Sequence, residues 1–258
     1  MLNLDQIAGY YPEKLRYFPK NMLREYLQHK ILEIIFNSKF AGKLSFLGGT
    51  ALRIFYINSR FSEDLDFDNL GLGKEDFSAL ASHIEKELSK QGYQVETRNV
   101  FKGVFRCYIK LPKILFDNKL SDMADEKILI QVDVAPHDFT YTPERLILNK
   151  FDIFTEVHVT PPDILLAQKI YAALNRKRAK GRDFFDIIFL LQNNKPNYEY
   201  LNKKIDIDNA SDLKKKLIES FAKVNFNEMA KDVEPFLFDP SDSRKIKNFM
   251  AFIKQTTF

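Results

Sequence analysis

Three aspartates alternate with apolar residues in the segment DLDFD, residues 64–68. Side chains two residues apart on a β-strand point to the same side, so Asp64, Asp66 and Asp68 would share one face of a strand. Carboxylates spaced about 6–7 Å along a strand repel one another unless water or a cation offsets the repulsion. Because Mg²⁺ prefers oxygen ligands and binds through one or two carboxylates, this spacing predicts a magnesium site.

A glycine turn, Gly48-Gly49-Thr50, precedes these aspartates, with 13 residues between Thr50 and Asp64. The residues before the turn predict a short strand and those after it a short helix. Glycines at such a junction let the backbone approach a phosphate, and a helix start offers unpaired N–H groups and a positive dipole end. We therefore expect Gly48, Gly49 and Thr50 to hold the phosphates of a nucleotide. Arg53, one turn further on, is expected to reach a phosphate or to pair with the aspartates.

A further carboxylate on a different strand, Asp133, interrupts the apolar segment ILIQVDVAP, residues 128–136. An aspartate in such a strand is costly to bury without a partner, and a metal shared with Asp64 and Asp66 would supply one. Taken singly, GGT is usually a turn, DLDFD is more often an exposed edge strand or loop, and Asp133 suits a structural role. Together they favour an active site for metal-assisted phosphoryl or nucleotidyl transfer.

A second cluster of charges lies in QKIYAALNRKRAKGRDFFDI, residues 168–187. On a helix, Lys169 and Arg176 fall on one face with two alanines between them. In the next helix Arg182 is spaced to pair with Asp186, and Asp183 lies one turn from Asp186. Spacing alone leaves two interpretations open, a functional cluster or a solvated helix surface whose charges complement the helix dipole.

The surrounding sequence predicts the elements that must position these residues. Helical periodicity covers residues 20–40 and 74–92, and strand patterns cover 43–47, 62–70, 93–101, 104–112 and 127–136. Beyond two prolines at 161 and 162, helical patterns follow one another at residues 162–181, 182–194, 211–224 and 241–257. We therefore predict an α+β fold, with a sheet of about five strands in residues 1–160 and a helical bundle in residues 161–258.

The composition narrows the class of protein. With 258 residues, of which 45% are apolar, the chain is long enough to bury a substantial core. A net charge of +4 is mild, so any contact with nucleic acid must come from a local basic surface. The single cysteine excludes an intramolecular disulfide and a multi-cysteine metal site. The first residues lack the layout of a secretory signal, and no apolar run approaches the ~20 residues that cross a bilayer, which predicts a cytoplasmic protein without a membrane segment.

The segment GGTALRIFYINSRFSEDLDFD resembles the nucleotidyltransferase superfamily, in which a Gly-Gly or Gly-Ser turn precedes an Asp-x-Asp or Asp-x-Glu pair. It is similar more narrowly to the AbiEii/MenT-type nucleotidyltransferase toxins, where the Gly-Gly-Thr turn and the string RFSEDLDF are characteristic. The segments KIYAALNR and RDFFD resemble that family's Lys-Leu-x-Ala-x-x-x-Arg helix and its Arg-Asp-x-x-Asp motif, with Ile170 in place of the usual leucine. The resemblance covers residues 43–192.

The resemblance implies a polymerase-beta-like, mixed-sheet catalytic domain at residues 1–160 and a helical domain at residues 161–258 that contributes Lys169 and the RDxxD motif to the active-site cleft. It implies that Asp64 and Asp66 bind Mg²⁺ or Mn²⁺, with Asp68 accessory or structural and Asp133 as third carboxylate. Lys169 is expected on the triphosphate. The remaining residues carried over from the second motif are Asp183, Asp186, Arg176 and Arg182, and which aspartate is essential stays open.

The resemblance also implies a reaction, the transfer of a nucleotide from an NTP to RNA, with the 3′ end of tRNA as the expected acceptor. It implies the role of a toxin with a cognate antitoxin. Two alternatives remain at this stage, a protein as the acceptor or a catalytically idle module that binds nucleotide or RNA. The basic helices in residues 195–258 suit either an RNA-binding surface or ordinary solvated helix faces.

Overall fold

The computed structural model describes residues 2–258. The chain forms two compact units, which we call the N-terminal unit (Met1–Tyr56 with Phe61–Val159) and the C-terminal unit (Ile57–Arg60 with Thr160–Phe258). The short segment Ile57–Arg60 thus belongs to the C-terminal unit although it lies between two elements of the N-terminal unit. Within residues 2–258, no helix is both long and apolar enough to span a membrane.

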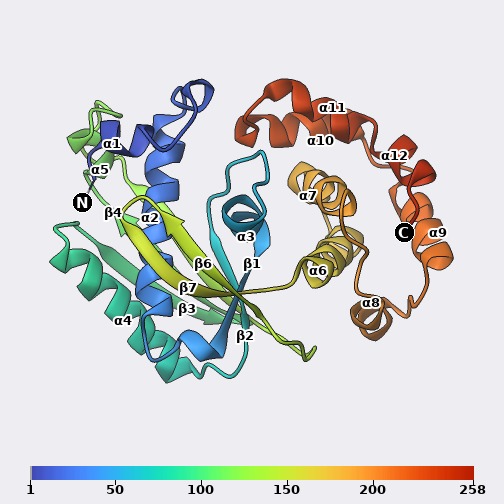
Figure 1. Cartoon of the computed structure of the whole chain (residues 1–258), viewed down its shortest axis with the longest axis horizontal. Coiled ribbons are helices and arrows are strands. Elements are labelled where there is room, and N and C mark those ends of the chain that lie inside the picture. The colour runs from blue at the N-terminus through green and yellow to red at the C-terminus, as the bar shows by residue number, and fades with distance from the viewer. Residues whose placement is uncertain (1) are drawn as a thin grey trace. The chain divides into compact units, whose positions relative to one another are not determined.

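The N-terminal unit is built on one mixed sheet of seven strands (Figure 1). Two neighbouring pairs are parallel, β1 with β7 and β2 with β5, and the other pairs are antiparallel. In spatial order the strands are β3 (Glu96–Lys102), β4 (Val104–Leu111), β5 (Ile128–Pro136), β2 (Leu65–Asn69), β1 (Leu44–Leu47), β7 (Ile153–Val159) and β6 (Glu144–Lys150).

Two long helices, α2 (Pro19–Phe36) and α4 (Lys74–Lys90), pack against the sheet and against each other, so they cover the same face (Figure 1). The strands alternate to match, because Leu65 and Phe67 of β2 are buried while Asp66 between them is half-buried. The shorter helices of this unit are α1 (Leu4–Ala8), α3 (Gly48–Phe55) and α5 (Ile114–Asp117). Both long helices and the junction of β1 with α3 agree with the sequence prediction.

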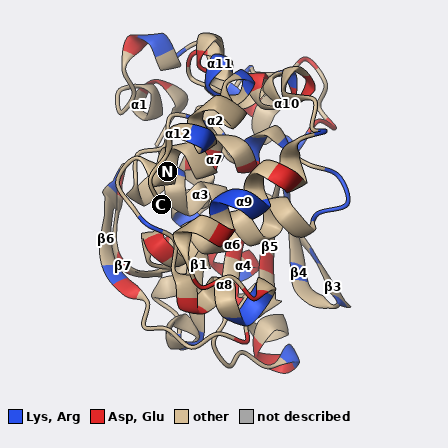
Figure 2. Cartoon of the chain, turned by 90° about the vertical axis from the view of Figure 1, so that its right-hand side faces the viewer, with Lys and Arg blue, Asp and Glu red and all other residues tan. Residues whose placement is uncertain are grey.

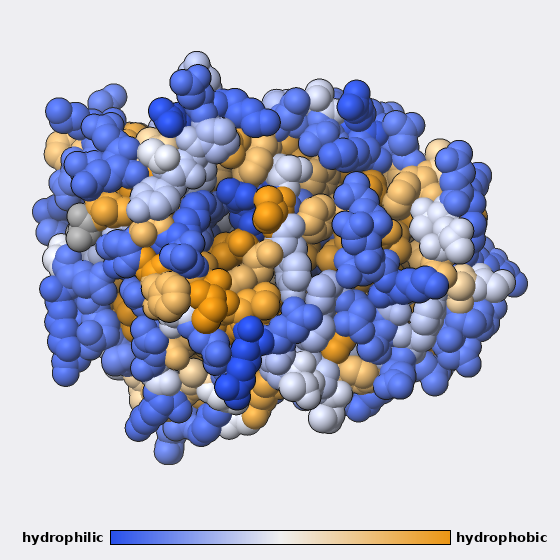
Figure 3. Space-filling view, viewed as in Figure 1, coloured by the Kyte–Doolittle hydropathy of each residue, from blue (hydrophilic) through white to orange (hydrophobic). Residues whose placement is uncertain are grey.

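The prediction of about five strands is wrong, because β6 and β7 add a hairpin at the edge of the sheet. These strands bury only alternate residues, and the other face leaves apolar side chains in solvent. Ile147 is 53% exposed and Phe154 is 69% exposed. Figure 3 shows the corresponding hydrophobic surface over β6 and β7. Glu144 and Lys150 are charged residues on the inward face of β6, and the outer face of β7 mixes the apolar Phe154 with the charged Glu156, so the alternation that identifies a strand from sequence is weakened.

The C-terminal unit is helical, and its core is aromatic. The ring of Phe184 meets those of Phe221, Phe226 and Phe249 at centroid distances of 5.1, 5.2 and 4.8 Å, a range typical of favourable aromatic pairs. The helices are α6 (Pro162–Asn175), α7 (Gly181–Leu191), α8 (Tyr198–Ile205), α9 (Ala210–Phe221), α10 (Phe226–Val233), α11 (Arg244–Lys247) and α12 (Phe249–Gln255). The α+β class and the helical C-terminal half are confirmed.

Several details of these helices differ from the sequence prediction, and α8 and α10 were not predicted at all. Helix α6 ends at Asn175, and Arg176 has an extended backbone with ψ of 131°, so Arg176 is not on the helix face expected for it. The last predicted helix is divided into α11 and α12. On α9, Lys214, Lys215 and Lys216 share the helix with Asp212 and Glu219, and Figure 2 shows blue and red stretches together there. The charge of this helix surface is therefore mixed.

Candidate active site

Gly48 and Asp66 are in close contact at the end of β1. Gly48 has a φ of +81°, a backbone conformation that glycine adopts without steric cost. A Cβ atom added to Gly48 would lie 2.4 Å from Oδ2 of Asp66 and 3.1 Å from its Cβ. Two features therefore require glycine at position 48: its backbone conformation and the carboxylate of Asp66 packed against it.

The segment that leads into the aspartates is held by its backbone carbonyls. The hydroxyl of Thr50 donates a hydrogen bond of 2.5 Å to the carbonyl of Asp64. The buried amide of Gln28, on α2, donates to the carbonyls of Ser62 (3.1 Å) and Glu63 (2.9 Å). Thr50 is fully buried, so its hydroxyl ties the glycine turn to the start of the aspartate strand. This use of Thr50 was not expected from the sequence.

Asp133 lies beside Asp66, because the parallel strands β2 and β5 pair Asp66 with Asp133 in register. Its carboxylate already has a charged partner in Arg106 of β4, whose Nε donates to Oδ1 (2.8 Å) and whose Nη2 donates to Oδ2 (2.7 Å). Gln131 adds a third hydrogen bond of 3.0 Å to Oδ2. Hydrogen bonding to Asp133 raises the pKa of the Arg106 guanidinium, so the arginine stays protonated in this bidentate pair.

Asp68, the last of the three aspartates, is drawn into a separate cluster. The hydroxyl of Tyr141 donates to its Oδ2 at 2.7 Å, and Nδ1 of His137 lies 3.2 Å from the same oxygen. The carboxylate is only 7% exposed. These contacts support the structural alternative for Asp68, and they place His137 against Asp68.

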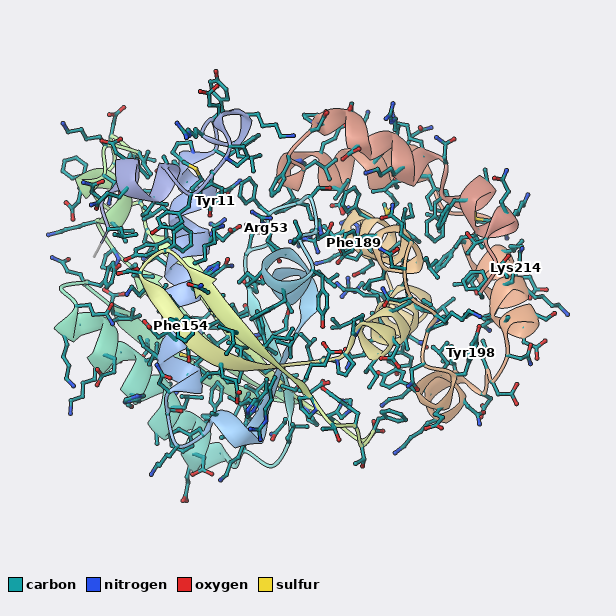
Figure 4. The ribbon with its side chains drawn as sticks, viewed as in Figure 1. Tyr11, Arg53, Phe154, Phe189, Tyr198 and Lys214 are labelled. Atoms are coloured by element: carbon teal, nitrogen blue, oxygen red, sulfur yellow. The ribbon has the colours of Figure 1, made fainter. Side chains whose placement is uncertain are left out.

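Arg53 is bound within the N-terminal unit by a buried carboxylate. Its Nε lies 2.9 Å from Glu25, and Lys150 lies 2.7 Å from the same carboxyl group. Burial would raise the pKa of Glu25, but Arg53 and Lys150 outweigh it and lower that pKa to about 2. Figure 4 labels Arg53 together with Tyr11, whose phenol pKa is raised by burial beside this cluster.

In the C-terminal unit the predicted second cluster is assembled around Asp186, which is completely buried on α7. Lys169 of α6 lies 2.8 Å from Asp186 and 3.7 Å from Asp183. Arg176 forms an ion pair with Asp183. Arg182, which sequence spacing had paired with Asp186, places its guanidinium over the ring of Phe236 at 4.4 Å.

The main cation on Asp186 is Arg60, from the segment Ile57–Arg60. Its Nε and Nη2 donate to the two carboxylate oxygens at 2.7 and 2.6 Å, and Asn58 adds a hydrogen bond of 2.9 Å. Burial would raise the pKa of Asp186, but Arg60 and Lys169 lower it to about 2. Arg60 is therefore a structural residue whose partner is the buried Asp186.

The sequence matches the family described as "Nucleotidyl transferase AbiEii toxin, Type IV TA system" over residues 30–257. The chain belongs to this family. This match confirms the resemblance that was inferred from the Gly-Gly-Thr turn and the RFSEDLDF segment. The protein is a nucleotidyltransferase. No curated protein sequence matches the chain.

Solved structures with a similar fold cover residues of both units. MenT4, a nucleotidyltransferase toxin from Mycobacterium tuberculosis H37Rv, is similar with a TM-score of 0.63 and 14% sequence identity, covering 100% of this chain and 91% of that one. JHP933 from Helicobacter pylori is similar with a TM-score of 0.55 and 17% identity, covering 91% of this chain and 90% of that one. At these identities the similarity establishes the fold.

Two carboxylates of this AbiEii-family chain are predicted to hold a divalent metal. Among residues 2–258, no group of three or more acidic, histidine or cysteine side chains converges as a metal cluster. Mg²⁺ needs fewer, because it usually keeps several waters and binds through one or two carboxylates. Asp64 and Asp66, both half-buried, are the pair predicted to bind it, and Asp66 packs against the glycine turn that is predicted to hold phosphate. Asp133 is less suited, since a guanidinium already binds both of its oxygens.

Proposed function

We propose that this protein transfers a nucleotide from an NTP to the 3′ end of an RNA, with tRNA as the acceptor, and that Mg²⁺ or Mn²⁺ is required. The family supports the coarser function, a nucleotidyltransferase toxin of a toxin–antitoxin system, which implies a cognate antitoxin as partner. The observation that carries the finer proposal is the contact between Asp66 and Gly48. It brings a carboxylate suited to a metal against a turn suited to phosphate.

The roles in the N-terminal unit follow from this contact. The backbone of Gly48 and Gly49 at the start of α3 would hold the triphosphate, with Thr50 fixing the turn to Asp64. Asp64 and Asp66 would hold the metal, which supplies charge neutralisation on the phosphates and activation of the acceptor hydroxyl when bound.

Asp133 is assigned to the acceptor hydroxyl. A carboxylate has about four acceptor positions, and Arg106 and Gln131 use three of those on Asp133. The position that remains, on Oδ1, suits the proton of the attacking hydroxyl. Arg106 would fix the orientation of the carboxylate.

Lys169 is assigned to the triphosphate, as the family resemblance implies. The buried Asp186 and the neighbouring Asp183 hold the lysine ammonium at 2.8 and 3.7 Å, which fixes its orientation. Asp186 is itself fixed by Arg60, so we assign Asp186 a positioning role for Lys169. Arg176 and Arg182 remain proposed nucleotide contacts.

The transfer is tested by incubating the protein with Mg²⁺, total tRNA and each α-³²P-labelled NTP in turn. We expect label on RNA from the wild type with one or more NTPs, and no label when Mg²⁺ is removed with EDTA. Label on protein in place of RNA would replace the acceptor and leave the site unchanged. Absence of label with every NTP, while nucleotide binding persists, would contradict the proposed transfer and favour a binding module.

A further inference from the structure

A cavity of ≈ 170 Å³ lies within the C-terminal unit against one face of α7. Phe185, Ile188, Phe189 and Gln192 line it at three- and four-residue steps, so they form a continuous stripe of the helix. The volume is roughly that of five or six water molecules. It is below the range of about 300 Å³ and more that holds a whole drug-sized ligand, so it suits a single ring system.

The chemistry of the lining suits a flat ring with polar edges. Phe185 and Ile188, which are 2% and 6% exposed, make the buried apolar part. Phe189 projects from α7 as a half-buried ring (Figure 4). The polar groups are the amide of the exposed Gln192, the hydroxyl of Ser59 and the ammonium of Lys245, which lies 5.5 Å from the centroid of the Phe185 ring. Aromatic rings and amide or hydroxyl groups are the side chains that stack on nucleobases and bind their edges.

The segment Ile57–Arg60 connects this cavity to the Lys169 cluster. Asn58 and Arg60 bind Asp186, while the alternate residues Ile57 and Ser59 line the cavity. The segment is fixed on its other edge by the hydrogen bond from the Phe238 N–H to the Ser59 carbonyl, 3.2 Å long. The contacts that orient Asp186 therefore also shape the cavity wall.

Ile57 provides an independent sign of a binding site. Its φ is +62°, which is an outlier for a β-branched residue. Its apolar side chain is nevertheless 78% exposed, so burial of that side chain does not explain the conformation. Backbone strain of this kind is found at ligand clamps and active sites.

We propose that this cavity binds a nucleobase, with Phe189 and Ile57 against its face and with Gln192 and Ser59 on its hydrogen-bonding edge. The inference rests on the proposed nucleotidyl transfer, because that reaction brings two substrates with nucleobases to the protein. The base belongs either to the incoming NTP or to the acceptor RNA, and the shared chemistry is an aromatic heterocycle with donors and acceptors on its edge.

The test measures binding by calorimetry on the full chain, with each of the four NTPs and, separately, with total tRNA. Phe189→Ala is expected to weaken binding of one of these two ligand classes about 5- to 150-fold, the range for losing one base–aromatic stack. Gln192→Leu keeps the size of the side chain and is expected to reduce the differences in affinity among bases. The matched controls are Phe154→Ala, an exposed residue of β7, and Asn193→Leu, next to Gln192, and both are expected to bind like the wild type.

A third variant separates binding from folding. Ile57→Gly relieves the positive φ, so it is expected to unfold at the same or a higher temperature than the wild type while binding the ligand more weakly. Weaker NTP binding in the cavity variants would assign the cavity to the substrate base, and weaker tRNA binding to an acceptor base. Unchanged affinity for both ligand classes in Phe189→Ala and Gln192→Leu would overturn the proposal.

Calorimetry needs no turnover, which keeps this test separate from the proposed function. A wild type that binds through the cavity but transfers nothing would contradict the transfer and leave the cavity assignment standing. Normal transfer together with unchanged binding in all cavity variants would overturn the cavity alone. A wild type that binds neither NTP nor tRNA would overturn both.

Discussion

Replacing Gly48 with alanine is the most direct test of the phosphate turn. The added Cβ would lie 2.4 Å from Asp66 Oδ2, whereas an ordinary contact begins at 3.4 Å, so the carboxylate or the turn must move by 1.0 Å (3.4 − 2.4). A displacement of about 1 Å in a catalytic constellation costs on the order of 100-fold in rate. The backbone adds a penalty of about 1–2 kcal/mol, because alanine is strained at a φ of +81°.

Gly103→Ala separates the two effects. Gly103 has a φ of +78°, and a Cβ there would meet no atom within 4 Å. Both variants are therefore expected to lose about 1–2 kcal/mol of stability, and only Gly48→Ala to lose about 100-fold in kcat/KM for labelled-nucleotide transfer. Urea denaturation and transfer would be measured on the same preparations. Transfer by Gly48→Ala within threefold of Gly103→Ala would refute the contact with Asp66 as the reason for this glycine.

Three further predictions concern stability. Arg60→Met removes the main cation from the buried Asp186, which Lys169 and Asn58 still bind. The free energy of unfolding, measured by urea denaturation, is expected to fall by about 3 kcal/mol. A loss below about 1 kcal/mol would contradict the burial of this pair. Gly181→Ala would place a Cβ 1.9 Å from the carbonyl oxygen of Met229, so α7 and α10 must separate at a cost of at least about 2 kcal/mol in stability. The control Gly42→Ala, whose added Cβ would have no atom within 4 Å, should show little change in melting temperature. Burial lowers the pKa of His29 from 6.5 to about 4 in the folded protein, so on acidification the unfolded chain takes up this proton before the folded chain does. The free energy of unfolding should therefore be highest above pH 6.5 and fall by up to about 3 kcal/mol between pH 6.5 and pH 4. In His29→Gln the free energy of unfolding, taken from denaturation curves at several pH values, should depend less on pH between 6.5 and 4. An unchanged pH dependence would assign the effect to other groups.

Local periodicity was enough to predict the long helices, the strand β2 and the face of β2 that carries the aspartates. Helices α2 and α4 and strand β2 follow their patterns over several repeats, so their existence and type were clear. The spacing from Gly48 to Asp66 placed a turn before a strand, and the residues of that segment carried the resemblance to the nucleotidyltransferase family, which the family match confirms. The hairpin β6–β7 was missed because its outer face mixes charged and apolar residues.

The partners of the charged residues were not predictable, because they depend on register and on distant contacts. Arg106 meets Asp133 only because β4 and β5 pair in one register, and a shift of one residue would put the two on opposite faces. Arg60 and Asp186 are separated by 126 residues in the chain. A sequence pattern shows which face a residue occupies, while the residue opposite it is decided by the tertiary fold.

The central claim, that Asp66 and not Asp68 serves the transfer, is tested most directly by comparing Asp66→Asn with Asp68→Asn. The measurement is the initial rate of label transfer from α-³²P-NTP to tRNA at saturating Mg²⁺, on samples matched for folded fraction by circular dichroism. We predict a loss of at least about 100-fold for Asp66→Asn and a rate within a few-fold of wild type for Asp68→Asn, whose carboxylate is held by Tyr141 and His137. Equal losses in both variants, or a fully active Asp66→Asn, would contradict the assignment.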